Sequence, residues 1–334
     1  MKVIELSHGG GGVESQQLIQ QLFFNYFSND ILLKAEDAAL LSLQGQTAFT
    51  TDSFTVSPLF FNGGNIGNLA IAGTLNDLAM MGAQPLYLSC SFIIEEGLPY
   101  QTLEQVVQSM AKELEQSEAK IVCGDTKVVP KGAVDQLFIN TAGLGQVLDK
   151  ITAPSVQNVS VGDALIISRD IGRHGAVIMA ERESLSVDST LQSDCQVLWP
   201  AVKALLKSGL QIHALRDVTR GGLAAVLNEW ASSSQVCLEI EEAAIPICQP
   251  VQGLCELLGF EAYDFANEGT FIISLPAEEA EHALRVLKQF EFCQSTQLIG
   301  KVTDFQPGLV VLNTPWGSQR VLELPKGELL PRIC

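Results

Sequence analysis

Carboxylates at the edges of apolar segments are the clearest chemical signal in the first half of this 334-residue sequence. A carboxylate in such a place cannot stay buried and ionised without a partner. Carboxylate oxygens suit Mg²⁺, so several of them together could hold one or two ions that carry a nucleotide. Spacing alone leaves a helix cap or a turn as the alternative for each residue. The pattern occurs in EDAAL, TTDS, LNDLA and CGDTK, at Asp37, Asp52, Asp77 and Asp125.

Two further features of this half suit a phosphate chain. A run of four glycines could close its backbone amides on an anion in front of the next helix, or it could be a flexible connection. It matches neither GxxxxGK[ST] nor GxGxxG, so it is weak evidence by itself. Lys127 follows Asp125 by two residues and could neutralise phosphate charge as a point donor. The run consists of Gly9, Gly10, Gly11 and Gly12.

Three more motifs stand in the second half of the chain. In DVTRGG, Asp217 either caps the following helix or belongs to a site, and in FANEG, Glu268 either closes a turn or belongs to a site. The chain ends in PKGELLPRIC, which resembles no packed element, so we expect a tail there. Its last residue, Cys334, is by itself either an incidental exposed thiol or a reactive group.

Composition excludes several classes of function. The chain has 38 acidic and 20 basic residues, and its net charge of −18 repels phosphate backbones and anionic lipid surfaces. We therefore expect no sequence-independent binding to nucleic acid or membrane. There is no signal-peptide pattern and no run of about 18 apolar residues, so we expect a cytosolic protein. The eight cysteines lack CxxC spacing and the four histidines are scattered, which disfavours a disulfide framework, a zinc site or an iron–sulfur site.

Apolar periodicity predicts alternating helices and strands in both halves, which favours two α/β or α+β layers over an all-helical or all-β fold. A turn-rich stretch at residues 150–162 is the expected boundary between a domain at 1–155 and a domain at 156–322, with a tail at 323–334. We expect helices near residues 13–27, 65–81, 103–114, 173–182, 195–207, 222–232 and 277–290. We expect strands near residues 38–43, 47–51, 86–94, 119–123, 137–147, 164–168, 236–240, 270–275 and 309–313.

In their order along the chain, these segments resemble the HypE family of carbamoyl dehydratases, which serve the maturation of [NiFe]-hydrogenase. The resemblance covers essentially the whole chain, and its most specific element is the C-terminal Pro331-Arg332-Ile333-Cys334. Four glycines stand where serine or another small residue often interrupts the run, a departure that puts no chemistry in doubt. The matching strings are LSHGGGG, FTTDSFTVSPLFFNGGNIG, GTLNDLAMMGAQP, LSCSFIIEEGLP, VCGDTKVVPKG, FINTAGLG, LRDVTRGGLAAVLNE, FANEG and PRIC.

The resemblance implies a fold and a reaction. The family belongs to the superfamily of aminoimidazole ribonucleotide synthetase, selenophosphate synthetase and thiamine-monophosphate kinase. It implies an N-terminal α/β domain that pairs across a homodimer, a C-terminal ferredoxin-like α/β domain, and ATP with Mg²⁺ between them. A carbamoyltransferase, HypF, would place a carbamoyl group on the thiol of Cys334. ATP-dependent dehydration would convert that thiocarboxamide to a thiocyanate, and the cyano group would pass to a HypC–HypD complex that assembles the iron centre.

Residue roles follow from the matched motifs. Cys334 would carry the reacting group, Glu268 would bind metal or remove a proton, and Lys127 would act on the phosphates. The glycine run at 9–12 would cover the phosphates as a lid. Asp217, Thr219 and His8 lie in matched motifs without an assigned role. The metal ligands would be Asp37, Asp52, Asp77 and Asp125, and ATP would also contact Asn76, Asp77, Asp125 and Lys127.

Three alternatives remain open at this point. Selenophosphate synthetase carries a reactive cysteine or selenocysteine in its N-terminal glycine loop, whereas the first cysteine here is Cys90. A thiamine-monophosphate kinase needs no terminal thiol and leaves the PRIC ending unexplained. A non-enzymatic acidic scaffold that presents its C-terminus to the maturation complex would differ from all of these in lacking ATP turnover.

Overall fold

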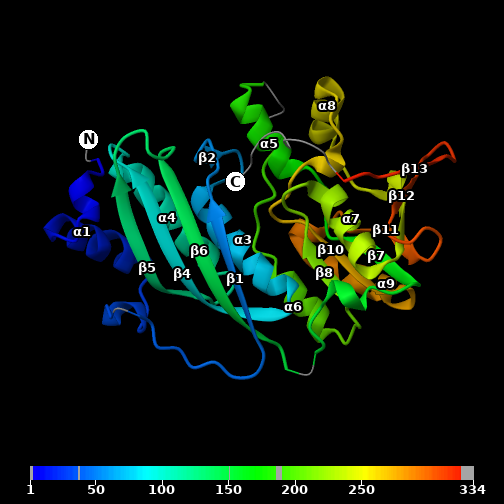
Figure 1. Cartoon of the computed structure of the whole chain (residues 1–334), viewed down its shortest axis with the longest axis horizontal. Coiled ribbons are helices and arrows are strands. Elements are labelled where there is room, and N and C mark those ends of the chain that lie inside the picture. The colour runs from blue at the N-terminus through cyan, green and yellow to red at the C-terminus, as the bar shows by residue number, and fades with distance from the viewer. Residues whose placement is uncertain (1–2, 37, 150, 186–189, 325–334) are drawn as a thin grey trace.

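The structure is a computed structural model that describes residues 3–36, 38–149, 151–185 and 190–324. The predictions for Asp37 and Cys334 therefore lie outside the described residues. Two β-sheets with their helices form the two halves of the molecule, and helix α3 (Ile66–Met80) lies between them (Figure 1). No helix in the described part of the chain is long and apolar enough to cross a lipid bilayer.

The N-terminal sheet has four strands in the order β1-β6-β4-β5. β4 and β5 are parallel and the other pairs are antiparallel. Buried and half-buried residues alternate strictly along β6, as expected for a sheet with one covered face. α3 packs on that face, and α4 (Tyr100–Leu114) packs on α3. The strands are β1 (Thr47–Phe54), β4 (Ala83–Glu95), β5 (Lys120–Val129) and β6 (Leu137–Val147), and the short β2 (Phe60–Phe61) and β3 (Gly64–Asn65) form a separate hairpin.

Two predictions for the N-terminal segment need correction. The helix predicted over residues 13–27 is continuous but changes pitch, from α1 (Val13–Leu18) through a π-helical turn (Ile19–Phe23) to α2 (Phe24–Tyr26). The strand predicted at residues 38–43 is wrong, because this stretch pairs with no strand in the described part of the chain and Leu40 is 91% exposed. An apolar run does not by itself supply the hydrogen-bond partner that a strand needs.

The C-terminal sheet has seven strands in the order β13-β12-β9-β11-β7-β10-β8. Its last four strands are all antiparallel and have the 4-1-3-2 order of a ferredoxin-like sheet, as the resemblance implied. β9, β12 and β13 extend this sheet, and β9 and β12 are parallel. The strands are β7 (Asp163–Ile167), β8 (Ala214–Asp217), β9 (Cys237–Glu241), β10 (Phe271–Pro276), β11 (Gln297–Thr303), β12 (Val310–Asn313) and β13 (Gln319–Val321).

Helices join these strands, and one of them, α6, contacts α3 and β4 of the N-terminal half. Four of them were expected from periodicity, whereas α8 was missed, as were the strands β8, β11 and β13. The two sheets fall on either side of residues 148–162, a range that contains the turn-rich stretch predicted as the boundary at 150–162, and the domain limits at 155 and 322 stay predictions. The helices are α5 (Arg173–Arg182), α6 (Trp199–Lys207), α7 (Gly222–Ser234), α8 (Gln249–Leu258) and α9 (Ala280–Leu287).

Candidate functional site

An acidic cluster forms where α3 meets the edges of both sheets. On β1, Thr50 and Asp52 alternate with exposed residues, and Thr50 faces α3, because its Oγ1 donates a hydrogen bond to Asp77 Oδ2 on that helix (2.6 Å). Asp217 ends β8, which packs against α3, and Glu268 lies in the loop that leads into β10. Asp217 and Glu268 are buried. We call Asp52, Asp77, Asp217 and Glu268 the acidic cluster.

Burial and mutual repulsion shift the pKa values of this cluster. Burial, and then the charge of Asp77, raises the pKa of Asp52. Burial also raises the pKa of Asp77, although the Thr50 hydroxyl opposes that shift. The same two causes, burial and the charge of Asp77, raise the pKa of Asp217 to about 7. Burial and neighbouring carboxylates, among them Asp217 and Asp52, raise the pKa of Glu268 well above its ordinary value. The cluster thus concentrates negative charge that a bound cation would relieve.

The cluster suits a divalent cation only with help from other ligands. Within the described residues, no three His, Cys, Asp or Glu side chains lie close enough together to form a metal site. Nucleotide phosphates could complete the set, since Mg²⁺ is commonly held by one or two carboxylates together with phosphates and water. The described residues therefore fit a cation that arrives with a nucleotide better than a permanently bound ion.

Asp194 is a site residue that the sequence analysis missed. It is buried, and its carboxylate accepts hydrogen bonds from Glu268 N (3.1 Å), Gly269 N (2.9 Å) and Thr270 Oγ1 (2.9 Å). These bonds hold the FANEG loop and so fix where Glu268 stands. No local pattern marks Asp194, because all three donors are about 75 positions away along the chain.

Asn76, predicted to contact ATP, holds the two domains together in this structure. Its Oδ1 accepts from Leu198 N (2.8 Å) and its Nδ2 donates to Gln196 O (3.0 Å). Both partners belong to the segment before α6 in the C-terminal domain. The two bonds align α3 with that segment, and a contact between Asn76 and ATP stays a prediction.

The DVTRGG motif forms a tight turn directly after β8. Gly222 N donates to Thr219 O (2.9 Å), and Gly221 and Gly222 have φ values of 78° and 62°, in the left-handed region that favours glycine. A Cβ on Gly222 would lie 2.1 Å from the carbonyl oxygen of Tyr263. Glycine is therefore required for α7 to begin against the segment that precedes the FANEG loop.

We expect Gly222→Ala to lower the free energy of unfolding by about 3 kcal/mol or more, through the backbone clash and the positive φ. Urea unfolding of the full chain measures this. The matched control is Gly253→Ala inside α8, where nothing lies within 4 Å of an added Cβ. That change should be neutral or stabilising by up to about 1 kcal/mol. Equal effects of the two substitutions would contradict the packing argument.

The other predicted phosphate contacts lie at the far edge of the N-terminal sheet. Asp125 and Lys127 are exposed on β5 and form an ion pair (3.6 Å). Through the register of the sheet, Asp52 pairs with Thr141, Thr141 with Cys90, and Cys90 with Gly124. Asp52 and Asp125 are thus three strand spacings apart, about 14 Å. Within one chain the described aspartates do not converge on a single site.

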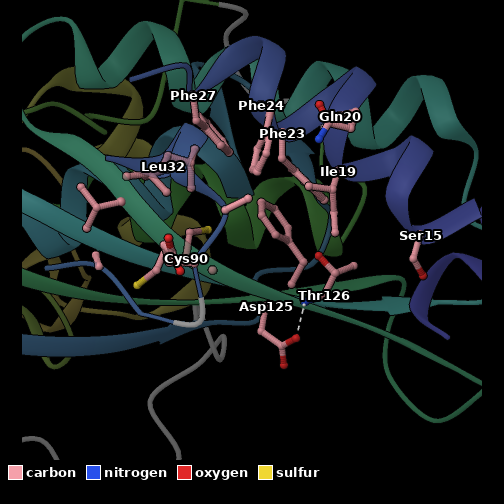
Figure 2. Close-up of a pocket in the computed structure, with 18 of the residues that line it drawn as sticks. Ser15, Ile19, Gln20, Phe23, Phe24, Phe27, Leu32, Cys90, Asp125 and Thr126 are labelled. Carbon is pink, nitrogen blue, oxygen red and sulfur yellow. Dashed lines mark hydrogen bonds between the residues drawn. The ribbon is translucent and has the colours of Figure 1, made fainter. Parts of the chain in front are cut away.

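A pocket of about 1060 Å³ lies beside Asp125 and Lys127. The side chains of Phe23 and Phe27 point into it from the N-terminal helical segment, toward the strands that carry Cys90 and Asp125 (Figure 2). The pocket thus has aromatic walls and a charged rim. Such a pocket suits a flat apolar group attached to an anionic one.

The glycine run borders the same pocket. Gly9 and Gly11 line it together with His8. The loop is tied to the start of α1 by Ser15, whose Oγ accepts from Gly11 N (2.9 Å) and donates to His8 O (2.7 Å). The backbone of this loop therefore lies within reach of a ligand in the pocket, while its action as a lid stays a prediction.

Known proteins resemble this chain along its whole length. The family model described as AIR synthase related protein, N-terminal domain, matches residues 35–147, and the model of the C-terminal domain matches residues 160–311. Carbamoyl dehydratase HypE of Escherichia coli (strain K12) is 47% identical over 340 residues, which cover 100% of both chains.

Solved structures agree with the sequence comparison. A crystal structure of hydrogenase maturation protein HypE in complex with ATP has a TM-score of 0.95 at 45% identity and covers 99% of each chain. A chain in the crystal structure of a HypE–HypF complex has a TM-score of 0.81 at 44% identity, covering 92% of this chain and 99% of that one. The similarity therefore extends over both domains and over the interface between them.

Proposed function

Because this chain belongs to the HypE family of carbamoyl dehydratases, we propose that it removes water from a carbamoyl group in an ATP-dependent reaction of hydrogenase maturation. The observation that carries the proposal is the convergence of carboxylates from both domains on one cluster, in a chain that ends in a cysteine. Nothing in the site favours a small-molecule kinase, which would leave the terminal cysteine without a role.

The substrate is the S-carbamoyl group on Cys334. Its carbonyl oxygen attacks the γ-phosphorus of ATP, and ADP leaves with the electrons of the broken phosphorus–oxygen bond. Phosphate then departs with the former carbonyl oxygen, and both N–H protons are lost, which leaves S–C≡N. Nine residues separate Leu324, the last described residue, from Cys334, so ten residue-to-residue steps give a reach of at most about 36 Å. That reach suits a thiol that visits both a carbamoyltransferase and its own ATP site.

The acidic cluster receives the phosphates. One or two carboxylates of the cluster, Asp52 and Asp77 first among them, would hold Mg²⁺ together with phosphate oxygens and the predicted ligand Asp37, and the ion would neutralise charge on the phosphates. Glu268 is the candidate proton acceptor, because burial raises the pKa of its carboxyl and makes the carboxylate a stronger base than usual. Asp194 holds the loop that carries this group.

A homodimer would reunite the two halves of the predicted ATP site. β1 carries Asp52 at one edge of the N-terminal sheet, and β5 carries Asp125 and Lys127 at the other. The sheet face turned away from α3 is partly apolar and uncovered, with Phe49 70% exposed and Ile93 38% exposed. If two such faces pack about a two-fold axis, β5 of one chain can lie beside β1 of the other. The nucleoside would then occupy the aromatic pocket of one chain and the phosphates the acidic cluster of its partner.

Two kinds of protein partner follow from the proposed reaction. The carbamoyltransferase that transfers the group to Cys334 would be HypF, a partner supported by the solved complex of a relative with HypF. A HypC–HypD complex would accept the cyano group. We place these events in the cytoplasm, because the seven cysteines in the described part of the chain are all free thiols, as a reducing compartment keeps them.

The proposed function is tested by the intact mass of the chain. After incubation with HypF, carbamoyl phosphate and ATP, Cys334 should carry a carbamoyl adduct, which should lose one water only with fresh Mg–ATP. Cys334→Ala should take no adduct, whereas Cys248→Ala, at a half-buried cysteine directly before α8, should behave like the wild type. An adduct that never loses water would identify a carrier instead of a dehydratase. The absence of an adduct on the wild type would overturn the role of the terminal cysteine.

A further inference from the structure

We propose that Arg220 is a further catalytic residue, whose guanidinium binds the transferring phosphoryl group of ATP at the acidic cluster. This inference rests on the proposed function. Arg220 stands in the turn between Thr219 and Gly222, and its Nη2 lies 3.8 Å from Asp52 Oδ1. The side chain is 69% exposed, so it can change partner without leaving a buried charge behind.

The ion pairs around the cluster single out Arg220. A second guanidinium, that of Arg216, is held by Glu229 on α7 (3.4 Å). In the described part of the chain, the one ion pair of Arg220 is with Asp52, which we assign to the cation. When a divalent ion neutralises Asp52, Arg220 loses that partner, and its donors can turn to phosphate oxygens, which they match in a bidentate geometry.

The local backbone presents Arg220 to the cluster. Asp217 precedes it by three residues at the end of β8, and Val218 N is held by Thr270 O (2.8 Å). The base of the turn is therefore anchored in the sheet, while Gly221 and Gly222 supply the left-handed conformations that complete the turn. The guanidinium thus projects from a well-held base beside Asp52.

Phosphoryl transfer gives this cation a chemical task. As the bond from the γ-phosphorus to the β,γ-bridging oxygen breaks and the bond to the carbamoyl oxygen forms, negative charge spreads over the transferring oxygens. A guanidinium at that place stabilises the charge. Lys127, predicted for this role, lies on the opposite edge of the sheet and pairs with Asp125, so it could reach the cluster only from a partner chain, whereas Arg220 stands beside Asp52 of its own chain.

Three readouts test the inference. The dehydration rate of carbamoylated Cys334 should fall about 100- to 1000-fold in Arg220→Gln and less in Arg220→Lys. Millimolar guanidinium should partly restore the rate of Arg220→Ala, which a structural loss would not allow. Nucleotide-free Arg220→Gln should bind Mn²⁺ about threefold more tightly by electron paramagnetic resonance, because the competing cation beside Asp52 is gone. The matched control is Arg285→Gln, which changes an exposed arginine on α9. This variant should keep the wild-type dehydration rate and Mn²⁺ affinity and should gain nothing from added guanidinium.

Each outcome decides one point. A dehydration rate of Arg220→Gln within a few-fold of the wild-type rate would overturn the catalytic role of Arg220. A large loss that guanidinium does not rescue, with a lower melting temperature, would show that Arg220 only supports the fold. A wild-type chain that accepts the carbamoyl group but never loses water would instead overturn the proposed function. In that case the Mn²⁺ titration would still show whether Arg220 competes for the acidic cluster.

Discussion

A mixture of Asp77→Asn and Asp125→Asn chains should recover about a quarter of the wild-type dehydration rate, although each variant alone should be at least about a hundredfold slower. The reason is the separation of the two residues. Asp77 belongs to the acidic cluster, next to β1, and Asp125 stands on β5 at the opposite edge of the sheet. If each ATP site combines the cluster of one chain with β5 of its partner, a mixed dimer contains one intact site and one doubly defective site. Random pairing makes half of the dimers mixed. Because each mixed dimer has one intact site of two, a quarter of all sites are active.

The measurement requires two differently tagged chains that are co-expressed and then assayed for water loss by intact mass. The matched control is a mixture of Asp77→Asn with Asp217→Asn. Both of these residues belong to the acidic cluster of one chain, so no pairing can rebuild an intact site, and no activity should return. Recovery in neither mixture would show that Asp125 serves the cluster of its own chain, and would contradict the composite site. A wild-type rate for Asp125→Asn by itself would show that Asp125 serves no ATP site.

Asp194→Asn should destabilise the protein by about 3 kcal/mol and strongly slow the dehydration. The buried carboxylate of Asp194 accepts three hydrogen bonds. In the asparagine variant, the NH₂ group of the amide would face at least one of the N–H or O–H groups that now donate to the carboxylate, so that hydrogen bond would be lost. The substitution also removes a repulsion, since the charge of Asp194 raises the pKa of Glu268. That gain is smaller than the loss, because one repulsion is relieved while the hydrogen bonds from three buried donors are weakened or lost. The net effect of Asp194→Asn on the free energy of unfolding is therefore a decrease.

Urea unfolding and the single-turnover rate measure these two effects. Asp304→Asn makes the same chemical change on an exposed aspartate and should stay within about 0.5 kcal/mol of the wild type. A destabilised Asp194→Asn chain with normal dehydration would show that the FANEG loop does not need Asp194 to position Glu268. An equally stable variant would contradict the hydrogen-bonding argument itself.

Several features could be predicted from the sequence because they depend on neighbours along the chain. The helix over residues 65–81 and the strand over 137–147 appear as α3 and β6, since composition and alternation are local signals. The order of motifs also sufficed to identify the family, and the predicted fold class agrees with the structure. The prediction of a strand at 38–43 was wrong, because strand formation requires a partner strand that no local signal reveals.

The composition of the site was decided by contacts between distant parts of the chain. The sequence alone determined that Asp52, Asp77 and Asp125 stand at the edges of apolar segments, but the strand order β1-β6-β4-β5 places the first two together and the third about 14 Å away. Likewise, only the packing of β8 against α3 places Asp217 near Asp77. Only the tertiary structure places the Asp194 carboxylate where it accepts a hydrogen bond from Glu268 N. Side-chain periodicity is set by the local backbone, whereas strand order and domain contacts depend on pairing between residues from about 30 to more than 100 positions apart, which no local pattern encodes.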